Sequence, residues 1–192
     1  MRMILEMDAT RLRHTFKLWM IPGAVKRAQY LKDKNVFASF GEQCNYMDRR
    51  VPLYAKLIKI GDNVHFTSHV TFLTHDVAHM MINRMYEKNI ASEKVGCIEI
   101  GNNVFVGSNV TILYNVKIGN NGVIGAGSLV NKDVSDNVVV GGVPARVIGD
   151  FDSFVNRRIT ETNETEQPIG EYISLSLQST MWDSFSKARN KL

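Results

Sequence analysis

The sequence of 192 residues contains little cysteine and has no long apolar run. Its two cysteines, Cys44 and Cys97, lie far apart, so a disulfide framework is not expected and a reducing compartment is favoured. No segment approaches the roughly eighteen uninterrupted apolar residues of a membrane span. The N-terminus carries Arg2, Glu6 and Asp8, with no apolar signal-peptide stretch after them. We therefore expect a cytoplasmic protein.

A large charge of either sign is also missing. Lys and Arg number 23 and Asp and Glu number 19, which gives a formal net charge of +4. A mildly basic chain suits an anionic small molecule or a position near an anionic surface, although most such charges are simply solvated. We expect no nucleic-acid partner. The length corresponds to about one domain, which is enough to bury a sizeable core.

What the chain does contain is a six-residue repeat across residues 100–134. Its apolar positions are Ile100, Val106, Ile112, Ile118, Ile124 and Val130. Four residues after each of these comes a small or β-branched residue, namely Val104, Val110, Val116, Gly122, Ser128 and Val134. No α-helix has a period of six, whereas a short strand followed by a turn does, so the repeat predicts a solenoid of stacked coils.

Each coil is expected to be triangular, with three six-residue faces. The apolar residue that starts each repeat would point inward and stack on its counterpart one coil earlier. Glycine follows four of these residues, and it suits a corner where the backbone turns tightly or adopts a positive φ. An earlier full coil begins at Ile60, and before it Val36–Phe40 and Tyr54–Ile58 look like incomplete coils.

Three further phrases accompany the repeat: Thr74-His-Asp76, the glycine-rich run 124–134 and Val140-Gly-Gly-Val-Pro-Ala-Arg-Val-Ile148. Together they resemble the hexapeptide-repeat acyltransferases, most closely the galactoside, maltose and xenobiotic O-acetyltransferases. The resemblance covers roughly residues 36–148. It implies an all-β solenoid that is a left-handed parallel β-helix, a homotrimer with sites between subunits, and acetyl-CoA as the co-substrate.

The segments outside the repeat predict three additions to the β-helix acyltransferase domain at 36–149. Residues 1–35 are expected to be an N-terminal helical cap, whose first helix has one apolar face made by Leu12, Phe16, Trp19 and Met20. The alternative for this segment is a basic amphipathic helix on a membrane surface, so membrane association would be peripheral. Residues 77–97 break the repeat and predict a protruding, partly helical loop. Residues 150–192 form a C-terminal extension with a linker near 160–170 and a last helix.

His75 is the candidate general base, because an imidazole with a pKa near 6.5 can accept a hydroxyl proton and return it to a departing thiolate. The resemblance places it at the family's catalytic histidine. Asp76 could orient the imidazole, bind an acceptor hydroxyl or cap the following segment. His79 is a candidate contact to the acceptor, with plain surface as the alternative. Ser39 and Asp48 are acceptor candidates by resemblance, with ordinary loop polarity as the alternative.

The resemblance also implies how the cofactor is bound. Ser108 lies where a backbone N–H and a hydroxyl contact the thioester, and a turn serine is the alternative. The remaining cofactor candidates are a small-residue corner for the pantetheine arm, an asparagine where related chains often have threonine, and two cations for the phosphates. These residues are Gly125, Ala126, Asn131, Lys132 and Arg146. Solvated charge is the alternative for both cations.

No metal is expected, although several histidines lie close together in sequence. His65 and His69 would share a face only on a helix, and their region predicts strands and corners. No Cys or Glu stands beside them at zinc-ligand spacing.

The resemblance therefore implies an acetyl-CoA-dependent O-acetyltransferase, acting on a hydroxyl of a sugar or a cell-surface polysaccharide precursor by direct attack in a ternary complex. Two alternatives remain. A xenobiotic acetyltransferase of the chloramphenicol or streptogramin type would need an apolar acceptor groove, for which Met80, Met81 and Tyr86 are candidates. A non-catalytic β-helix scaffold is the alternative from another class, and the intact set of candidate site residues argues against it.

Overall fold

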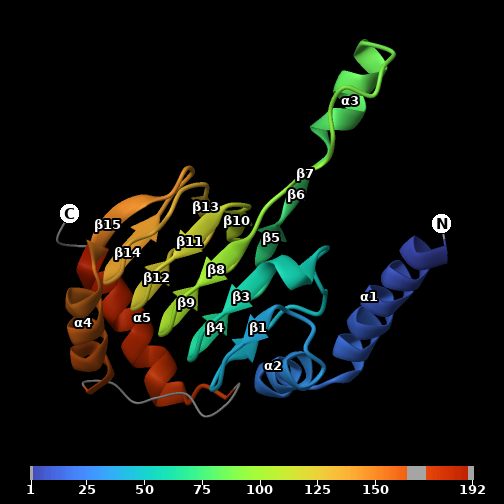
Figure 1. The fold of residues 1–192 in the computed structure, drawn as a ribbon. Coiled ribbons are helices and arrows are strands. Elements are labelled where there is room, and N and C mark those ends of the chain that lie inside the picture. The colour runs from blue at the N-terminus through green and yellow to red at the C-terminus, as the bar shows by residue number, and fades with distance from the viewer. Residues whose placement is uncertain (1, 164–171, 190–192) are drawn as a thin grey trace. The chain divides into compact units, whose positions relative to one another are not determined.

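The computed structural model of the chain describes residues 2–163 and 172–189, with side chains placed for 9–161 and 172–189 (Figure 1). The chain divides into two units, residues 1–151 and residues 152–192. The first unit contains the repeat and the N-terminal helices, and the second contains two helices. Each is described by itself.

Most strands of the first unit are two or three residues long, as the six-residue repeat predicts. In chain order they are β1 (Ser39–Phe40), β2 (Asn45–Tyr46), β3 (Ile58–Ile60), β4 (Val64–Phe66), β5 (Thr71–Leu73), β8 (Ile98–Ile100), β9 (Val104–Val106), β10 (Thr111–Leu113), β11 (Val116–Ile118), β12 (Gly122–Ile124), β13 (Leu129–Val130) and β14 (Val138–Gly141). A short 3-10 helix, η1 (Ala55–Leu57), precedes β3.

These strands form three parallel sheets (Figure 1). Sheet A has the order β1-β3-β8-β11, sheet B contains β2-β4-β9-β12-β14, and sheet C contains β5-β10-β13. The chain visits A, B and C in turn and then moves one strand along each sheet, so β3, β4 and β5 make one coil and β8, β9 and β10 the next. The last strand, β15 (Arg146–Asp150), pairs antiparallel with β14 at the edge of sheet B. The predicted solenoid of parallel coils is confirmed.

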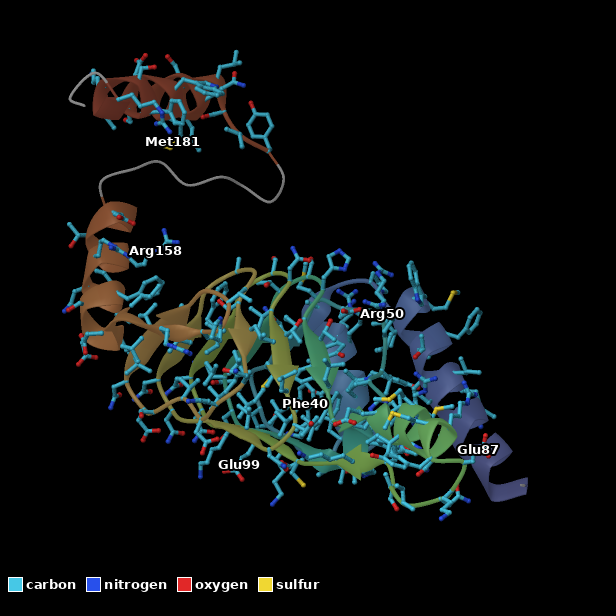
Figure 2. All side chains as sticks on the ribbon, turned by 90° about the horizontal axis from the view of Figure 1, so that it is seen from above. Phe40, Arg50, Glu87, Glu99, Arg158 and Met181 are labelled. Carbon is cyan, nitrogen blue, oxygen red and sulfur yellow. The ribbon has the colours of Figure 1, made fainter. Side chains whose placement is uncertain are left out.

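The interior of the coils is filled by the residues that start the repeats. All six apolar positions from Ile100 to Val130 are 2% exposed or less. In sheet A, Ile60 pairs with Ile100, which pairs with Ile118, so equivalent residues stack from coil to coil. In Figure 2, Phe40 lies among the side chains that fill the coils, whereas Glu99 points outward from sheet A. The predicted inward direction of the repeat is confirmed.

The glycines of the repeat lie where adjacent coils approach closely. A Cβ added at Gly101 would lie 2.8 Å from the backbone of Gly119, and one at Gly61 would lie 2.7 Å from the carbonyl oxygen of Gly101. The alternative explanation, a positive φ, is wrong for Gly101 and Gly119, which do not adopt it. The left-handed conformation falls two residues later, on a series of asparagines: Asn63, Asn103, Asn109, Asn115, Asn121 and Asn137.

Asparagine suits these positions because it tolerates positive φ better than most non-glycine residues. Its side chains also connect the coils at the corner between sheets A and B. The Asn63 amide donates to Asn103 at 3.0 Å, Asn103 donates to Asn121 at 2.9 Å, and Asn121 donates to Asn137 at 2.8 Å. This ladder repeats the hydrogen-bonding pattern of the sheets in side chains.

Two helices precede the coils, as expected, with a break at residues 21–23. Helix α1 spans Arg2–Met20 and α2 spans Ala24–Asp33. Helix α2 lies against β2 and β1. Its Arg27 is 4% exposed, and its guanidinium donates to the carbonyl oxygens of Ile21, Tyr46 and Met47.

The apolar face expected for α1 is largely exposed. Leu12, Phe16, Trp19 and Met20 are all exposed, and Leu18 is the buried side chain among residues 9–20 of this helix. The helical spacing identified a shared face correctly, but spacing alone does not say whether that face points toward the protein.

The break in the repeat forms an arm (Figure 1). A two-stranded antiparallel ribbon, β6 (His75–Asp76) with β7 (Lys94–Val95), leads to helix α3 (Ala78–Met85), which stands away from the coils. The ribbon begins two residues before the expected start of the excursion, so His75 belongs to the base of the arm. No residue of α3 is buried.

The second unit contains α4 (Phe151–Asn163) and α5 (Leu175–Arg189). Helix α4 includes the first residues of the expected linker, whose remainder lies outside the described residues. Trp182 and Phe185 share one side of α5, with ring centroids 5.4 Å apart. Across residues 2–163 and 172–189, no helix combines the length and apolarity needed to cross a membrane.

At Asn121 we expect a glycine substitution to be less destabilising than an alanine substitution, the reverse of the usual order. The φ of Asn121 is 53°, a region in which alanine is strained by about 1 kcal/mol or more and glycine is not. Both Asn121→Ala and Asn121→Gly lose the ladder contacts, so we expect Asn121→Gly to be the more stable of the two by about 1 kcal/mol in urea denaturation. At the neighbouring Asn120, which does not have positive φ, the alanine variant should be at least as stable as the glycine variant. The same ranking at both positions would contradict this interpretation.

Candidate active site

The candidate residues gather at two different corners of the coils. The C–A corner, where the chain passes from sheet C to sheet A, contains His75 and the arm in one coil, Tyr114 in the next, and Asn131 and Lys132 in the last. The B–C corner, where the chain passes from sheet B to sheet C, contains the remaining cofactor candidates. The two corners are separated along each coil by a strand of sheet C.

His75 stands at the base of the arm. Its backbone pairs with Val95, and its ring packs edge-on against Tyr54, with centroids 5.3 Å apart and planes at 83°. The Tyr54 hydroxyl donates to the carboxylate of Glu93 at 3.1 Å. The Nδ1 of His75 is buried and has no hydrogen-bond partner among the described residues. Proton exchange with a substrate would therefore fall to Nε2.

His75 differs in this respect from two other histidines of the first unit. The ring of His14 bonds the hydroxyl of Tyr30 at 2.8 Å, and the ring of His65 bonds the side chain of Asn63 at 2.9 Å. Those two imidazoles form hydrogen bonds within the protein, whereas no hydrogen bond joins the His75 ring to another described residue. Nδ1 of His79, on α3, is likewise buried without a partner among these residues.

Asp76 fixes the arm to the coils. Its Oδ2 accepts a hydrogen bond from the hydroxyl of Tyr114 at 2.7 Å, and its Oδ1 accepts one from the backbone N–H of Ala78 at 3.1 Å. The Tyr114 hydroxyl, followed by the Ala78 N–H, holds the pKa of Asp76 below its usual range, and Asp76 in turn raises the pKa of Tyr114. The ammonium of Lys94 lies over the Tyr114 ring at 5.1 Å. Of the three roles considered for Asp76, the geometry matches capping the segment that follows.

Ser108 lies at the B–C corner between β9 and β10. Its hydroxyl donates to Oγ1 of Thr67 at 3.2 Å, and Thr67 donates in turn to the carbonyl oxygen of Val106 at 2.8 Å. The carbonyl oxygen of Ser108 accepts the N–H of Gly127 from the next coil. Its own N–H has no backbone acceptor among the described residues, so the corner presents a donor to its surroundings.

The next coil places Gly125 and Ala126 directly beyond Ser108. A Cβ on Gly107 would lie 2.6 Å from the backbone nitrogen of Ala126, so the two coils are in close contact here. Ala126 is exposed, and its methyl leaves the corner open. The hairpin between β14 and β15 lies at the same corner, since the N–H of Leu129 donates to the carbonyl oxygen of Gly142. Arg146 begins β15 and is exposed.

Asn131 and Lys132 do not share this corner, although they follow it closely in sequence. They come after β13, at the C–A corner that also contains His75, and both are exposed. The structure thus brings Ser108, Gly125 and Ala126 together, and it places His75, Asn131 and Lys132 at a different corner of the same chain.

The two acceptor candidates outside these corners are separate from each other. Ser39 is exposed on β1, at the edge of sheet A. Asp48 follows β2 and lines a hollow of about 270 Å³ with Arg11, Thr15 and Phe72, among others. Its Oδ1 accepts the backbone N–H groups of Arg49 and Arg50, which holds the local turn. Within the described residues, no three His, Cys, Asp or Glu side chains gather as a metal ion would require.

Sequence reasoning missed Tyr114, Tyr54 and Thr67. Tyr114 occupies a variable position of the repeat, so only the fold reveals that the corner brings it to Asp76. Tyr54 precedes the clear repeat by six residues, and Thr67 carries no motif of its own.

Comparison of the sequence with known proteins gives three informative matches. A family model described as bacterial transferase hexapeptide (six repeats) matches residues 97–132. A galactoside O-acetyltransferase of Lactococcus lactis is 34% identical over 167 residues, which cover 74% of this chain and 73% of the relative. The galactoside O-acetyltransferase of Escherichia coli is 46% identical over 95 residues, covering 47% of this chain and 43% of the relative.

The structure is similar to that of a maltose O-acetyltransferase from Clostridium difficile. The TM-score is 0.52 at 26% identity, and the match covers 76% of this chain and 88% of the other. The chain spans only 43%, 58% and 63% of the length of three of the curated relatives that it matches, the Escherichia coli protein among them.

The contact between Tyr114 and Asp76 predicts a pH-dependent effect. Because the pKa of Asp76 is lowered in the folded protein, its contribution to stability is present above the ordinary aspartate pKa of about 3.9 and is lost as the pH falls through the lowered value. In Tyr114→Phe we expect the Asp76 pKa to rise toward that ordinary value, as followed by carboxyl-carbon NMR. The stability difference from the wild type should shrink on acidification. Tyr86→Phe, an exposed tyrosine of the arm, is the matched control. An unchanged Asp76 pKa in Tyr114→Phe would refute the assignment.

Proposed function

Because the chain belongs to the hexapeptide-repeat transferase family, we propose that it transfers an acetyl group from acetyl-CoA to a hydroxyl of a sugar or of a cell-surface polysaccharide precursor. The similarity to galactoside and maltose O-acetyltransferases supports this class of reaction. The observation that carries the proposal is His75, whose ring packs at the base of the arm and forms no hydrogen bond to another described residue.

In the proposed reaction, Nε2 of His75 accepts the proton of the acceptor hydroxyl while the hydroxyl oxygen attacks the thioester carbonyl. The new C–O bond forms, the C–S bond breaks, and the imidazolium returns the proton to the coenzyme A thiolate. No acyl-enzyme is formed. The negative charge that develops on the carbonyl oxygen requires a preorganised donor, for which the Ser108 N–H is the candidate, joined by the Ser108 hydroxyl when it turns away from Thr67.

The candidate residues for binding the cofactor lie at both corners. Gly125 and Ala126 present a backbone with little side chain, against which a pantetheine arm can lie. Arg146 at the B–C corner and Lys132 at the C–A corner supply the positive charge for the cofactor phosphates, with Asn131 beside Lys132. The residues present therefore fit acetyl-CoA as a co-substrate.

We also propose that the site is completed between copies of the chain in a homotrimer. Within one chain His75 and Ser108 lie at different corners, and stacked side chains fill the interior between them. If the C–A corner of one copy faces the B–C corner of the next, the base, the oxyanion donor and both cations surround one groove. The left-handed winding of the coils and the role of α2 as a cap belong to the same family-based proposal.

The His75 role predicts a large loss of turnover. With acetyl-CoA and a panel of sugars, nucleotide sugars, oligosaccharides and chloramphenicol, thiol release should depend on a carbohydrate acceptor. It should fall by roughly 10²- to 10⁴-fold in His75→Ala, the range expected for general-base catalysis. Coenzyme A binding by calorimetry should be retained. His65→Asn, on strand β4 of sheet B and outside both corners, is the matched control and should keep its activity.

Each other outcome of this assay has a definite meaning. Release with chloramphenicol alone would assign the enzyme to the xenobiotic group, with the exposed methionines of α3 as acceptor contacts. Full turnover in His75→Ala would remove the catalytic assignment. A protein that does not bind coenzyme A would support the scaffold alternative.

The two-corner arrangement predicts that inactive variants complement each other. His75→Ala removes the base, and Ala126→Trp fills the open corner, so each alone should be inactive. In an oligomer assembled from equal amounts of both, a site that takes one corner from each of two copies has both corners intact in about a quarter of cases. Co-refolding should then restore about a quarter of the wild-type activity. Mixing His75→Ala with His75→Asn should restore none. No recovery in the first mixture would place the whole site in one chain.

A further inference from the structure

Helix α1 turns a mainly polar face toward the rest of the first unit and leaves its apolar face exposed. The face toward the body contains His14, whose ring bonds Tyr30, and Thr15, whose hydroxyl accepts the N–H of Val51 at 3.2 Å. Leu18 is its only fully buried side chain among those described. The opposite face carries a stripe at helical spacing, and the exposed fractions of its residues are Leu12 59%, Phe16 70%, Trp19 61% and Met20 66%. Such a stripe normally faces a core.

The segment that contains this stripe carries an excess of positive charge. Residues 9–32 contain no Asp or Glu and six basic residues: Arg11, Arg13, Lys17, Lys26, Arg27 and Lys32. The rest of the chain has 17 Lys and Arg against 19 Asp and Glu, so the net charge of +4 arises entirely from this segment. Arg13 and Lys17 are exposed and lie next to the stripe on the helix, and neither forms a salt bridge with a described residue.

Trp19 is held in position within the stripe. The guanidinium of Arg49 donates to the carbonyl oxygen of Trp19 at 2.7 Å and lies 5.4 Å from the centre of its ring. The ring remains mostly exposed despite these contacts. A tryptophan with a cation at one end and an apolar stripe beside it has the composition typical of the boundary between lipid headgroups and acyl chains.

We propose that α1 is a docking surface for an anionic lipid bilayer, with the stripe Leu12, Phe16, Trp19 and Met20 inserted between headgroups and Arg13 and Lys17 against lipid phosphates. An anionic bilayer offers an apolar region to the stripe and negative phosphates to the two cations. A two-fold contact with a second copy through α1 fits less well, because it would bring Arg13 and Lys17 of both copies together without an acidic partner in residues 9–32. This inference does not depend on the acetyl-transfer proposal.

The test uses vesicles and the full chain. In a Trp182→Phe background, Trp19 is the only tryptophan, and its emission should shift to the blue with vesicles that contain about a third phosphatidylglycerol in phosphatidylcholine. Co-sedimentation should show much weaker binding to pure phosphatidylcholine and weaker binding at high salt. The double variant Phe16→Gln, Met20→Gln should bind at least tenfold less. Arg13→Gln with Lys17→Gln should weaken binding to the anionic vesicles by about 30-fold, from roughly a factor of five per cation.

The matched control is Met81→Gln with Met85→Gln, which removes two equally exposed apolar side chains from α3 and should leave vesicle binding unchanged. Circular dichroism should show that every variant is folded, as expected for exposed positions. Absence of binding by the wild type, or equal binding by the stripe variant, would overturn the proposal. If the wild type binds no vesicles and the stripe variant differs from it in particle mass by light scattering, the stripe would instead be a contact with another copy of the chain.

Discussion

The close stacking of the coils is the constraint on which the rest of the molecule depends. Adjacent strands of a sheet lie about 4.8 Å apart, so each inward side chain rests directly on the next. Ile60, Ile100 and Ile118 form one such column. At the corners the backbones approach so closely that Gly101 has no room for a Cβ. An interior filled in this way contains no ligand cavity, and chemistry is therefore restricted to corners and outer faces.

The sequence was sufficient for the interior because a six-residue period encodes inside and outside directly. Every repeat start from Ile100 to Val130 is buried as predicted. The arm was also predictable, since it is the place where the period stops. The direction of the α1 stripe was not, because helical spacing defines a face without saying what lies opposite it. The contact of Tyr114 with Asp76 was equally hidden, since it joins two positions that only coil stacking brings together.

The candidate site was likewise predictable from the sequence only in part. Motifs identified His75, Ser108 and Lys132 individually, but they could not show that Lys132 shares a corner with His75 and not with Ser108. That fact comes from counting strands around the coil. Under the proposed assembly, the B–C residues of one copy would act together with the C–A residues of a second copy. The proposed site would then depend on the geometry of assembly as much as on the sequence of one copy.

The contacts that hold the arm in place also position His75, the proposed base. Helix α3 buries no side chain, so its position depends on the two-residue ribbon, the Asp76 contacts and the Asn83 side chain, which closes the loop through Ile90 and Ala91. Segments with few buried apolar contacts open at low free energy. His75 therefore stands on one of the least stabilised parts of the first unit, and a neighbouring copy that covered α3 would order the base together with the groove. Assembly and the positioning of the base would then be one event.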